Sequence, residues 1–579
     1  MLNSVTPQNV KNYSHSQLNV LCDQLRNFIY DTVLQCGGHL ASNLGAVEST
    51  VALFYTFDFP NDKIVFDVGH QCYPYKILSG RKDAFHTLRQ FGGISGFPKR
   101  SESEYDSYDT GHAGTSVSAA LGIAKARDLT GENYNVIAYI GDGSFNNGLI
   151  YEALNSLKIL NTKILIVLND NGMSISPTVG GMHEILSGID GENPQEKIRL
   201  LEQFGLTYVG VKNGNDLEEM LDCAKQAKEL LKNGSVLLHI ATKKGKGYEF
   251  SEDHPTNTHG VSPAHTVKDR EYSEVLGETL CEMAETNPRV AVVSAAMKES
   301  LGLETFFNRF PERAFDVGIC EEHASVLCAS MASAGVKPYY AIYSTFLQRA
   351  FDEIVHDVCM MDLPVTFCID RAGISGADGE THQGVFDLSY LSMIPNLTII
   401  APKDTDEFKK ALQFSENFEK PLAIRYPRAG KFLFKTDEKP LELGKWEYLH
   451  KTGKSRVTVL AAGERGVTTA MQTLQSLQAK GKNFDVVNAR FIKPLDFDLL
   501  SNIESETVIT IEDNVLYGGF GNAVALWATQ NGLSYRVKCF AYDDKFIVHG
   551  GVAQLQKLYG VDPETIEKFI EEQLDGKRV

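Results

Sequence analysis

The chain has 579 residues, 43% of them hydrophobic, so it is long enough to bury several cores, and about three domains are expected. Its 56 basic and 74 acidic residues give a formal charge of −18, which argues against nucleic acid and anionic membrane surfaces as partners. No apolar run approaches the roughly 18 residues of a membrane span, and the N-terminal segment resembles neither a signal peptide nor a transit peptide.

Short runs rich in Val and Ile recur along the chain and alternate with helical patterns such as those over 116–129 and 151–160. The predicted strands are, in chain order, residues 136–140, 163–169, 290–296, 364–370, 397–402, 456–463, 485–491 and 507–513. Strands that are apolar throughout and separated by helices are typical of parallel sheets covered on both faces. The predicted fold class is therefore α/β, with doubly wound, mostly parallel sheets.

Two polar stretches interrupt this alternation, over 251–267 and over 431–450. Each contains Pro and charged residues in place of an apolar run, as interdomain segments do. We therefore expect three α/β domains, which cover residues 1–267, 268–432 and 433–579.

The sequence Gly-Asp-Gly at 141–143 directly follows one predicted strand, and Asn171 and Met173 follow the next. In an open parallel sheet the carboxyl ends of neighbouring strands share one rim, so Asp142 and Asn171 are expected to lie close together. A carboxylate, an amide oxygen and a backbone carbonyl are hard ligands that suit Mg²⁺, and the glycines let the backbone approach phosphates.

Either half of this pattern alone is explained by a tight turn or an Asx turn. The two halves together, each behind an apolar strand, resemble the thiamin diphosphate motif. A diphosphate also needs N–H donors, and the sequence GHAGTS at 111–116 opens a predicted helix whose N-terminus supplies them. Gly, Ser and Thr are also common helix caps, so this second signal is weak by itself.

Thiamin chemistry further needs a carboxyl group that hydrogen-bonds to the aminopyrimidine ring. Glu321 follows the apolar sequence DVGIC and begins a helix rich in small residues, in a different predicted domain from Asp142. The alternative explanation is that Glu321 and Glu322 are acids in the first turn of a helix, where the helix dipole favours them.

Longer stretches resemble the 1-deoxy-D-xylulose-5-phosphate synthase family of transketolase-like thiamin diphosphate enzymes, over almost the whole chain. The most specific are DVGHQCYPYKILSGR (67–81) and DRAGISGADGETHQG (370–384), supported by GGHLASNLGAVEST (37–50), GGISGFPKRSESEYD (92–106), KKGKGYE (243–249), DVGICEEH (316–323), YSTFLQRAFDEIVHDV (343–358), RYPR (425–428), RFIKPLD (490–496) and EDNVLYGGFG (512–521). The resemblance implies three domains of transketolase type.

The resemblance also implies which residues bind the cofactor. Mg²⁺ is expected on Asp142, Asn171 and the Met173 carbonyl, and Glu321 is expected to activate the aminopyrimidine, on which Phe346 stacks. Further expected cofactor contacts are Gly111, His112, Ala113, Gly141, Gly143 and Ser144.

For the substrates, the resemblance implies that histidines near the reacting carbons transfer protons, since their pKa lies near neutrality. The expected catalytic residues, besides Glu321, are His39, His70, His259, His382 and Asp378. The acceptor's phosphate is expected on Tyr343, Arg349, Arg371 and Arg428, because the guanidinium fork binds phosphate oxygens in pairs. A lone histidine is more often structural, and Arg371 with Asp378 is open to the alternative of a structural ion pair.

The reaction implied is the condensation of pyruvate with D-glyceraldehyde 3-phosphate to 1-deoxy-D-xylulose 5-phosphate and CO₂. It is the first step of the non-mevalonate isoprenoid pathway and supplies precursors of thiamin and pyridoxal. The family is homodimeric, and the ten scattered cysteines without a CxxC pair suit a reducing, cytoplasmic compartment. The alternatives are another transketolase-fold transferase with a different donor or acceptor, and a non-enzymatic paralogue.

Two features depart from the family pattern. After Gly143 the chain reads Ser144-Phe145-Asn146-Asn147, where the family usually has Ala and then a small hydroxyl residue two positions on. The segment between Met173 and His259 is also shorter than expected, which indicates a trimmed loop in the first domain.

Overall fold

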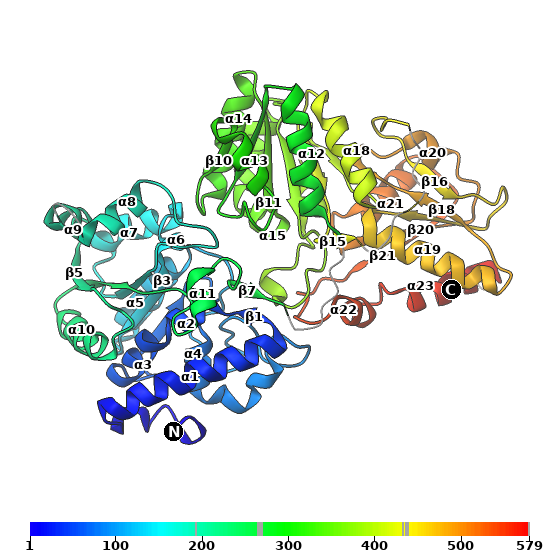
Figure 1. Ribbon diagram of the computed structural model, residues 1–579. Coiled ribbons are helices and arrows are strands. Elements are labelled where there is room, and N and C mark those ends of the chain that lie inside the picture. The colour runs from blue at the N-terminus through cyan, green and yellow to red at the C-terminus, as the bar shows by residue number, and fades with distance from the viewer. Residues whose placement is uncertain (191–193, 263–269, 431–433, 435–438, 577–579) are drawn as a thin grey trace. The chain divides into compact units, whose positions relative to one another are not determined.

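The structure is a computed structural model that describes residues 1–190, 194–262, 270–430, 434 and 439–576 (Figure 1). The chain forms two compact units. The first unit comprises Met1–Thr266 and Val317–Cys320, and the second comprises Val267–Asp316 and Glu321–Val579. Parts of both predicted interdomain stretches, 263–267 and most of 431–438, lie outside the described residues.

The first unit is built on a five-stranded sheet with the strand order β2-β3-β4-β6-β5, in which every pair is parallel. Its strands are β2 (Lys63–Phe66), β3 (Val136–Gly141), β4 (Leu165–Asp170), β5 (Leu206–Val211) and β6 (Ser235–Ala241). The strands predicted over 136–140 and 163–169 are thereby confirmed.

Alternate side chains of this sheet enter two separate cores. Tyr139 and Val167 pack with α1 (His15–Cys36), α3 (Val47–Thr56) and α10 (Leu217–Leu230). Their neighbours Ala138 and Ile166 pack with the helices of the opposite face, α5 (Ser116–Thr130) and α7 (Gly148–Leu160). Because successive side chains of a strand point to opposite faces, covering both faces requires the continuous apolar runs seen in the sequence.

Shorter elements complete the first unit. They are α2 (Ala41–Gly45), α4 (Tyr73–Lys76), α6 (Asp142–Phe145), α8 (Gly181–Ser187), α9 (Pro194–Glu202), α11 (Glu249–Asp253) and an antiparallel ribbon of β1 (Gly38–His39) with β7 (Gly260–Val261).

The second unit contains a seven-stranded sheet with the order β10-β9-β11-β12-β14-β13-β19, parallel except for its last strand. The strands are β9 (Val290–Ser294), β10 (Ala314–Asp316), β11 (Lys337–Tyr343), β12 (Thr366–Asp370), β13 (Thr398–Ile400), β14 (Leu422–Arg425) and β19 (Phe491–Lys493). The helices of this part are α12 (Tyr272–Thr286), α13 (Glu304–Arg309), α14 (Glu321–Ser333), α15 (Ser344–Leu347), α16 (Phe351–Glu353), α17 (Asp387–Ser392) and α18 (Thr405–Glu416), and a ribbon joins β8 (Arg270–Glu271) to β15 (Ala429–Gly430).

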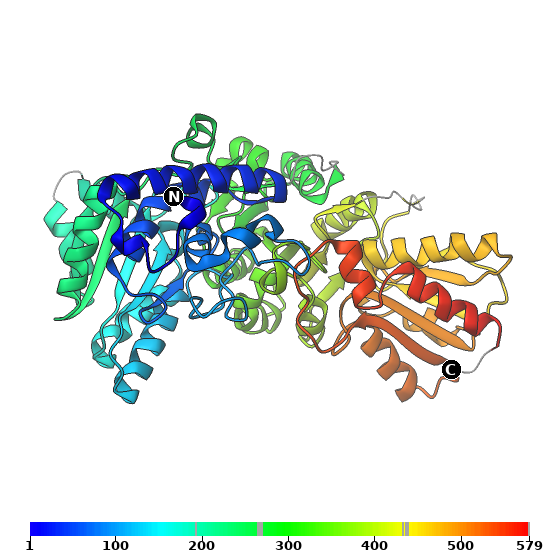
Figure 2. The same cartoon turned by 90° about the horizontal axis from the view of Figure 1, so that it is seen from below.

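A further five-stranded sheet lies in the C-terminal part of the second unit, with the order β16-β18-β17-β20-β21. The strands are β16 (Glu447–His450), β17 (Val457–Ala461), β18 (Asp485–Asn488), β20 (Thr507–Val515) and β21 (Arg536–Tyr542), and the helices are α19 (Gly463–Ala479), α20 (Phe497–Ser501), α21 (Phe520–Gln530), α22 (Val552–Leu558) and α23 (Pro563–Leu574). Figure 2 shows the strands between α19 and α23 on one side and α21 on the other. The predicted class of doubly wound, mostly parallel α/β sheets is confirmed.

One predicted strand limit is wrong. The strand predicted over 485–491 ends at Asn488, and Phe491 begins β19, which pairs antiparallel with β13 of the neighbouring sheet. The intervening Arg490 turns its guanidinium to Glu407 and Glu447, and a charged side chain held there separates the two strands. The last residues of the stretch over 431–450, which is predicted as an interruption, form β16.

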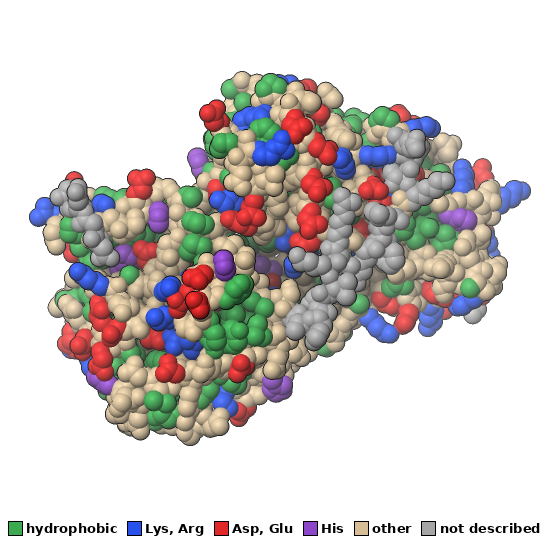
Figure 3. Space-filling view, in the orientation of Figure 1, with side chains coloured by type: hydrophobic (Ala, Val, Ile, Leu, Met, Phe, Trp, Pro, Cys, Tyr) green, Lys and Arg blue, Asp and Glu red, His purple; other side chains and the backbone are tan. Residues whose placement is uncertain are grey.

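Acidic and basic side chains are interspersed over the face of the molecule drawn in Figure 3. All ten cysteines are free thiols, and none is fully exposed. No helix among the described residues is long and apolar enough to cross a membrane.

The substitution Leu168→Ala in β4 tests how tightly the first sheet is packed. Leu168 is completely buried in the α5/α7 core, so its truncation should lower the free energy of unfolding by about 2–5 kcal/mol. Leu129→Ala is the matched control, because this leucine at the end of α5 is 81% exposed and its loss should cost less than about 0.5 kcal/mol. Urea unfolding of both variants gives the comparison, and equal destabilisation would contradict the packing described.

Candidate functional site

Asp142 and Asn171 lie together at the carboxyl ends of two neighbouring strands. Gly141 of β3 pairs in register with Asn169 of β4, so the residues that follow the two strands emerge side by side. The backbone N–H of Asn171 donates to Asp142 Oδ1 at 3.4 Å. The close approach predicted from the spacing of the two strands is therefore present.

Asp142 is a buried carboxylate, and the protein offers few groups that offset the cost of burying its charge. Only 2% of the residue is exposed, and Thr178 Oγ1 donates to its Oδ2 at 2.6 Å. Burial, followed by the negative charge of Asp170, raises the pKa of Asp142 to about 7. An ionised carboxylate in such a place is costly unless a cation is bound beside it.

Asp170 remains the ionised member of this acidic pair. Burial opposes its ionisation, but His239 Nε2 lies 2.9 Å from its Oδ2, and this hydrogen bond with the charge of His239 lowers the pKa of Asp170 overall. The site therefore carries at least one negative charge near neutral pH, as a cation site requires.

The turn after β4 holds the second expected ligand. Asn171 Oδ1 accepts a hydrogen bond from the N–H of Met173 at 3.2 Å, so the Asx turn considered as the alternative is present. An amide oxygen has two lone pairs, and this bond leaves acceptor capacity for a metal. Gly143 is fixed by packing against this turn, since a Cβ at this position would lie 2.7 Å from the Cβ of Ser174.

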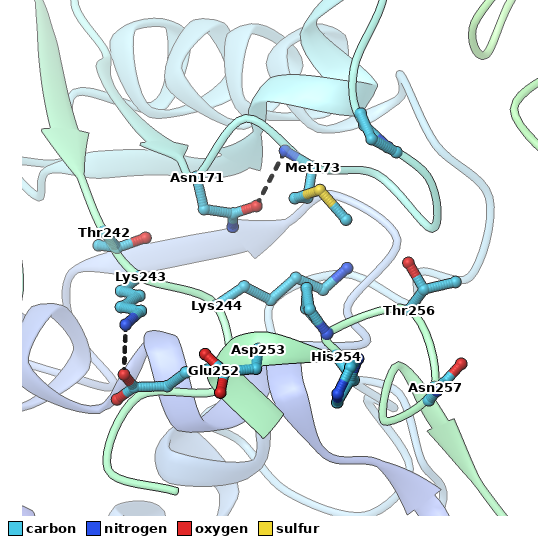
Figure 4. Close-up of a pocket in the computed structure, with 12 residues that line it drawn as sticks. Asn171, Met173, Thr242, Lys243, Lys244, Glu252, Asp253, His254, Thr256 and Asn257 are labelled. Atoms are coloured by element: carbon cyan, nitrogen blue, oxygen red, sulfur yellow. Dashed lines mark hydrogen bonds and ion pairs between the residues drawn. The ribbon is translucent and has the colours of Figure 1, made fainter. Parts of the chain in front are cut away.

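A cavity of about 530 Å³ borders this turn (Figure 4). It is lined by Asn171, Met173, Pro177, Thr242, Lys243, Lys244, Glu252, Asp253, His254, Pro255, Thr256 and Asn257. Lys244 extends across it with 5% of the residue exposed and donates to the carbonyl of Ser174. Burial lowers the pKa of Lys244 to about 8, against the opposing charge of Asp142, so the ammonium is still mostly charged at pH 7.

Lys244 was missed by the sequence analysis, which used the sequence KKGKGYE only as a family signal. A buried cation 70 residues from Ser174, its partner in this turn, leaves no local signature, and it becomes visible only where β6 ends beside β4. Its position suits an anionic ligand in the same cavity.

Asp67 was also missed, and it corrects one expectation. The N–H groups of Gly114 and Ser116, at the start of α5, donate to its carboxylate at 2.8 Å and 3.1 Å. Burial raises the pKa of Asp67, and these hydrogen bonds oppose the rise. Two N–H groups expected to face a diphosphate therefore hold the loop over 111–116 in place, and any contact of Gly111, His112 and Ala113 with a cofactor stays a prediction.

Three predicted histidines converge in the first unit. The ring centroids of His39 and His70 are 5.7 Å apart. The ring centroid of His259 lies 5.4 Å from that of His39 and 5.5 Å from that of His70. The ribbon of β1 with β7 causes this, because His39 pairs in register with Gly260. Burial, then the charge of Lys244 and the two other rings, holds the pKa of His259 well below its usual value, so its ring is neutral at pH 7.

The sequence Ser144-Phe145-Asn146-Asn147, which departs from the family pattern, makes specific contacts. Asn147 accepts from the N–H of Leu149 at the start of α7, and its Nδ2 donates to the carbonyl of Ile319 at 2.9 Å. Cys320 Sγ donates to the carbonyl of Asn146 at 3.3 Å. The two asparagines thus hydrogen-bond to the short segment Val317–Cys320, which belongs to the first unit.

Glu321, in the second unit, begins α14 and is 3% exposed. Burial raises the pKa of its carboxyl, and the charge of Arg349, whose Nη1 lies 3.5 Å from Oε2, partly offsets the rise. The environment therefore favours a carboxyl that holds its proton longer than an exposed glutamate does.

Aromatic rings and cations gather near the end of β11. Tyr343 and Phe346 stack with centroids 5.6 Å apart, and His382 meets Phe346 edge-on at 5.6 Å. The guanidinium of Arg371 lies 4.4 Å above the ring of Tyr343 and pairs with Asp370. Arg371 therefore forms an ion pair with Asp370, whereas the alternative considered from the sequence was a pair with Asp378.

The expected phosphate ligands are only partly brought together. Tyr343 and Arg371 form one cluster, Arg349 faces Glu321, and Arg428 pairs with Glu271 at 3.2 Å on a more exposed surface. Asp378 directly precedes the 3₁₀ turn Gly379–Thr381, in the same loop as His382.

Sequence comparisons place these residues in a known family. Residues 2–199 match the family described as 1-deoxy-D-xylulose-5-phosphate synthase, residues 268–430 the transketolase pyrimidine binding domain, and residues 444–566 the transketolase C-terminal domain. The 1-deoxy-D-xylulose-5-phosphate synthase of Clostridium tetani is 44% identical over 97% of each chain. The chain belongs to the 1-deoxy-D-xylulose-5-phosphate synthase family.

Two further synthases agree with this assignment to the family. The 1-deoxy-D-xylulose-5-phosphate synthases of Clostridium botulinum (strain Alaska E43 / Type E3) and Clostridium perfringens (strain 13 / Type A) are each 43% identical, over 97% and 98% of this chain and 98% of their own. Among solved structures, the transketolase of Campylobacter jejuni is 19% identical over 97% of this chain and 100% of its own, with a TM-score of 0.46. The protein is thus an enzyme of a family whose transketolase-type domains imply thiamin diphosphate.

The substitution Asp142→Asn should reveal the cost of the buried charge. Since burial raises the pKa from 3.8 to about 7, Asp142 is protonated in the folded but ionised in the unfolded protein between these values, and stability falls as pH rises through them. In metal-free buffer, raising the pH from 5 to 8 should lower the free energy of unfolding of the wild type by about 1–3 kcal/mol more than that of the variant.

Urea unfolding in EDTA at the two pH values provides the measurement. Asp83→Asn is the control, because its side chain is 97% exposed and its pH dependence should match the wild type. If Asp142→Asn followed the wild type as closely, the carboxylate would not be buried as described.

Proposed function

We propose that the protein condenses pyruvate with D-glyceraldehyde 3-phosphate to give 1-deoxy-D-xylulose 5-phosphate and CO₂, using thiamin diphosphate and Mg²⁺. The reaction places it at the first step of the non-mevalonate isoprenoid pathway and in the supply of thiamin and pyridoxal precursors. The proposal rests chiefly on the buried Asp142 beside Asn171, with Lys244 on the adjoining cavity, in a chain of this family.

The donor set supports Mg²⁺ over softer metals. Asp142, Asn171 and the Met173 carbonyl offer only oxygen ligands, which Mg²⁺ prefers. Among the described residues, no group of three or more His, Cys, Asp or Glu side chains is arranged to hold a metal, so a site of the zinc type has no support there. Lys244 would face the diphosphate oxygens in the same cavity.

Thiamin diphosphate, when bound, supplies the electron sink that decarboxylation of pyruvate requires. Glu321 would hold a proton at its carboxyl toward the aminopyrimidine, which suits its raised pKa. His259, neutral at pH 7, offers a ring nitrogen as a hydrogen-bond acceptor, and His39 and His70 lie within ring contact of it.

In the second unit, the proposed acceptor residues are Asp378 and His382, with Tyr343, Arg349, Arg371 and Arg428 for its phosphate. The aromatic cluster supports this in part, since Arg371 and His382 both contact the pair formed by Tyr343 and Phe346. We also propose the three domains 1–267, 268–432 and 433–579, a homodimeric assembly and a cytoplasmic location.

The decisive experiment follows both products. The protein is incubated with thiamin diphosphate, Mg²⁺, pyruvate and D-glyceraldehyde 3-phosphate, and CO₂ and the new sugar phosphate are measured. We expect both in equal amounts, and both lost in EDTA and restored by Mg²⁺. Absence of CO₂ with any aldehyde acceptor would overturn the proposal, and transfer from a ketose phosphate without CO₂ would assign a different transketolase-type reaction.

The substitution Glu321→Gln tests the proposed acid. General acid–base groups contribute about 10²–10⁴-fold, so turnover should fall by at least 100-fold while thiamin diphosphate binding, followed by calorimetry, changes little. The neighbour Glu322→Gln, in the same helical turn but partly exposed, should stay within about twofold of the wild type. Full turnover by Glu321→Gln would refute the role of this carboxyl.

A further inference from the structure

The segment over 371–384, which carries Asp378 and His382, is a closed loop. Gly373 and Gly384 exchange backbone hydrogen bonds, with N···O distances of 2.6 Å and 2.8 Å, and so close its base. Inside the loop Gln383 Oε1 accepts from the N–H groups of Ser375 and Gly376 at 2.7 Å and 3.1 Å. The loop therefore has a defined shape and does not depend on a bound ligand for it.

The C-terminal part of the second unit holds this loop through Asp513, at the end of β20. The N–H of Ile374 donates to both carboxylate oxygens of Asp513, at 3.1 Å and 3.3 Å. At Gly373, with φ +80°, a Cβ would lie 1.8 Å from Asp513 Oδ2, so only glycine permits this approach. The carboxylate and the base of the loop are fitted directly to each other.

Asp513 is itself held rigidly. Tyr542 of β21 donates its hydroxyl to Oδ1, and Arg465 of α19 donates to Oδ2. The residue is buried, so these are hydrogen bonds in a medium where charged partners interact strongly. Two elements of the C-terminal sheet region, β21 and α19, thus contribute hydrogen bonds to one carboxylate of β20 that faces the loop.

A second contact holds the far side of the loop. Gln383 Nε2 donates to the carbonyl of Val548 at 3.1 Å, and the N–H of Gly550 donates to the carbonyl of Gly376 at 3.4 Å. Both partners come from the segment between β21 and α22. The loop is therefore fixed at its base and along its side by the C-terminal part of the chain.

The same loop reaches the aromatic cluster described above. Thr345 Oγ1 donates to the carbonyl of Thr381 at 2.9 Å, and the ring of His382 meets Phe346. A shift of the loop relative to Asp513 would consequently move His382 against the aromatic pair.

We propose that Asp513 is a positioning residue for the acceptor substrate, and that it acts through the loop over 371–384. The C-terminal part of the chain thereby contributes to the choice of acceptor, although its sheet carries no residue assigned to the chemistry. This inference rests on the proposed function for the roles of Asp378 and His382, whereas the contacts between Asp513 and the loop do not.

The test combines kinetics with hydrogen exchange on the full-length holoenzyme. Asp513→Ala should raise KM for D-glyceraldehyde 3-phosphate by about 10- to 100-fold, the effect of one lost hydrogen bond to a charged group, with KM for pyruvate and affinity for thiamin diphosphate within about twofold. Asp513→Asn keeps an acceptor oxygen and should recover part of the loss. Amide exchange in the peptide covering 371–384, measured by mass spectrometry, should accelerate about tenfold or more in the alanine variant.

Asp562→Ala is the control for a general structural effect. Asp562 is equally buried in the C-terminal part and caps α23 through the N–H groups of Glu564 and Thr565, so its loss should cost stability without changing the KM ratio of the two substrates. If Asp513→Ala does not fold, Asp513→Asn and Tyr542→Phe replace it in the test. Each should raise KM for D-glyceraldehyde 3-phosphate by a smaller factor.

Two outcomes would overturn the inference. In the first, the loop peptide of Asp513→Ala exchanges faster while KM for D-glyceraldehyde 3-phosphate stays unchanged. In the second, KM for D-glyceraldehyde 3-phosphate and KM for pyruvate rise by the same factor, and they do so in Asp513→Ala and Asp562→Ala alike. A wild-type enzyme that makes no product from these substrates would instead refute the proposed function, and exchange of the loop peptide would still report whether Asp513 holds it.

Discussion

The carboxyl ends of parallel strands are where this fold concentrates polar groups, and the burial of Asp142 there is the constraint on which the first unit depends. Apolar cores cover both faces of the sheet, so Asp142 is cut off from water and its charge must be matched locally. Thr178 and the N–H of Asn171 provide only partial compensation. The turn after β4 and the cavity beside it make chemical sense as the surroundings of a cation and an anionic ligand.

The loops around this rim are held by hydrogen bonds and strand pairing within the protein. Asp67 fixes the start of α5, and the ribbon of β1 with β7 brings His39 against His259. Lys244 adds a buried positive charge, which together with burial helps to keep His259 neutral. Charge placement in the first unit therefore links the turn after β4 to His259.

The second unit also places its polar and aromatic groups at the ends of strands and helices, but with different residues. Its seven-stranded sheet places Glu321 and the aromatic cluster at strand and helix ends, and the loop over 371–384 is shaped by its own backbone and by Asp513. The C-terminal sheet region is thereby physically connected to the loop that carries Asp378 and His382.

The sequence by itself determined the class of fold, because continuous Val- and Ile-rich runs separated by helical patterns have few other solutions than covered parallel sheets. It also located Asp142 and Asn171 at neighbouring strand ends, since both follow a strand directly. The predicted end of the strand over 485–491 was wrong. The chain passes there from one sheet to the other, and the Arg490 side chain pairs with the buried Glu407.

Only the tertiary structure decided which distant residues meet. His39, His70 and His259 are separated by up to 220 positions, and nothing in their local sequences specifies that their rings come within 6 Å of one another. The same holds for Asp67 with the start of α5, for Lys244 in the cavity and for Asp513 with Ile374. Periodicity encodes which face of an element is buried, whereas the partner of a buried charge is set by long-range packing, which a local pattern does not record.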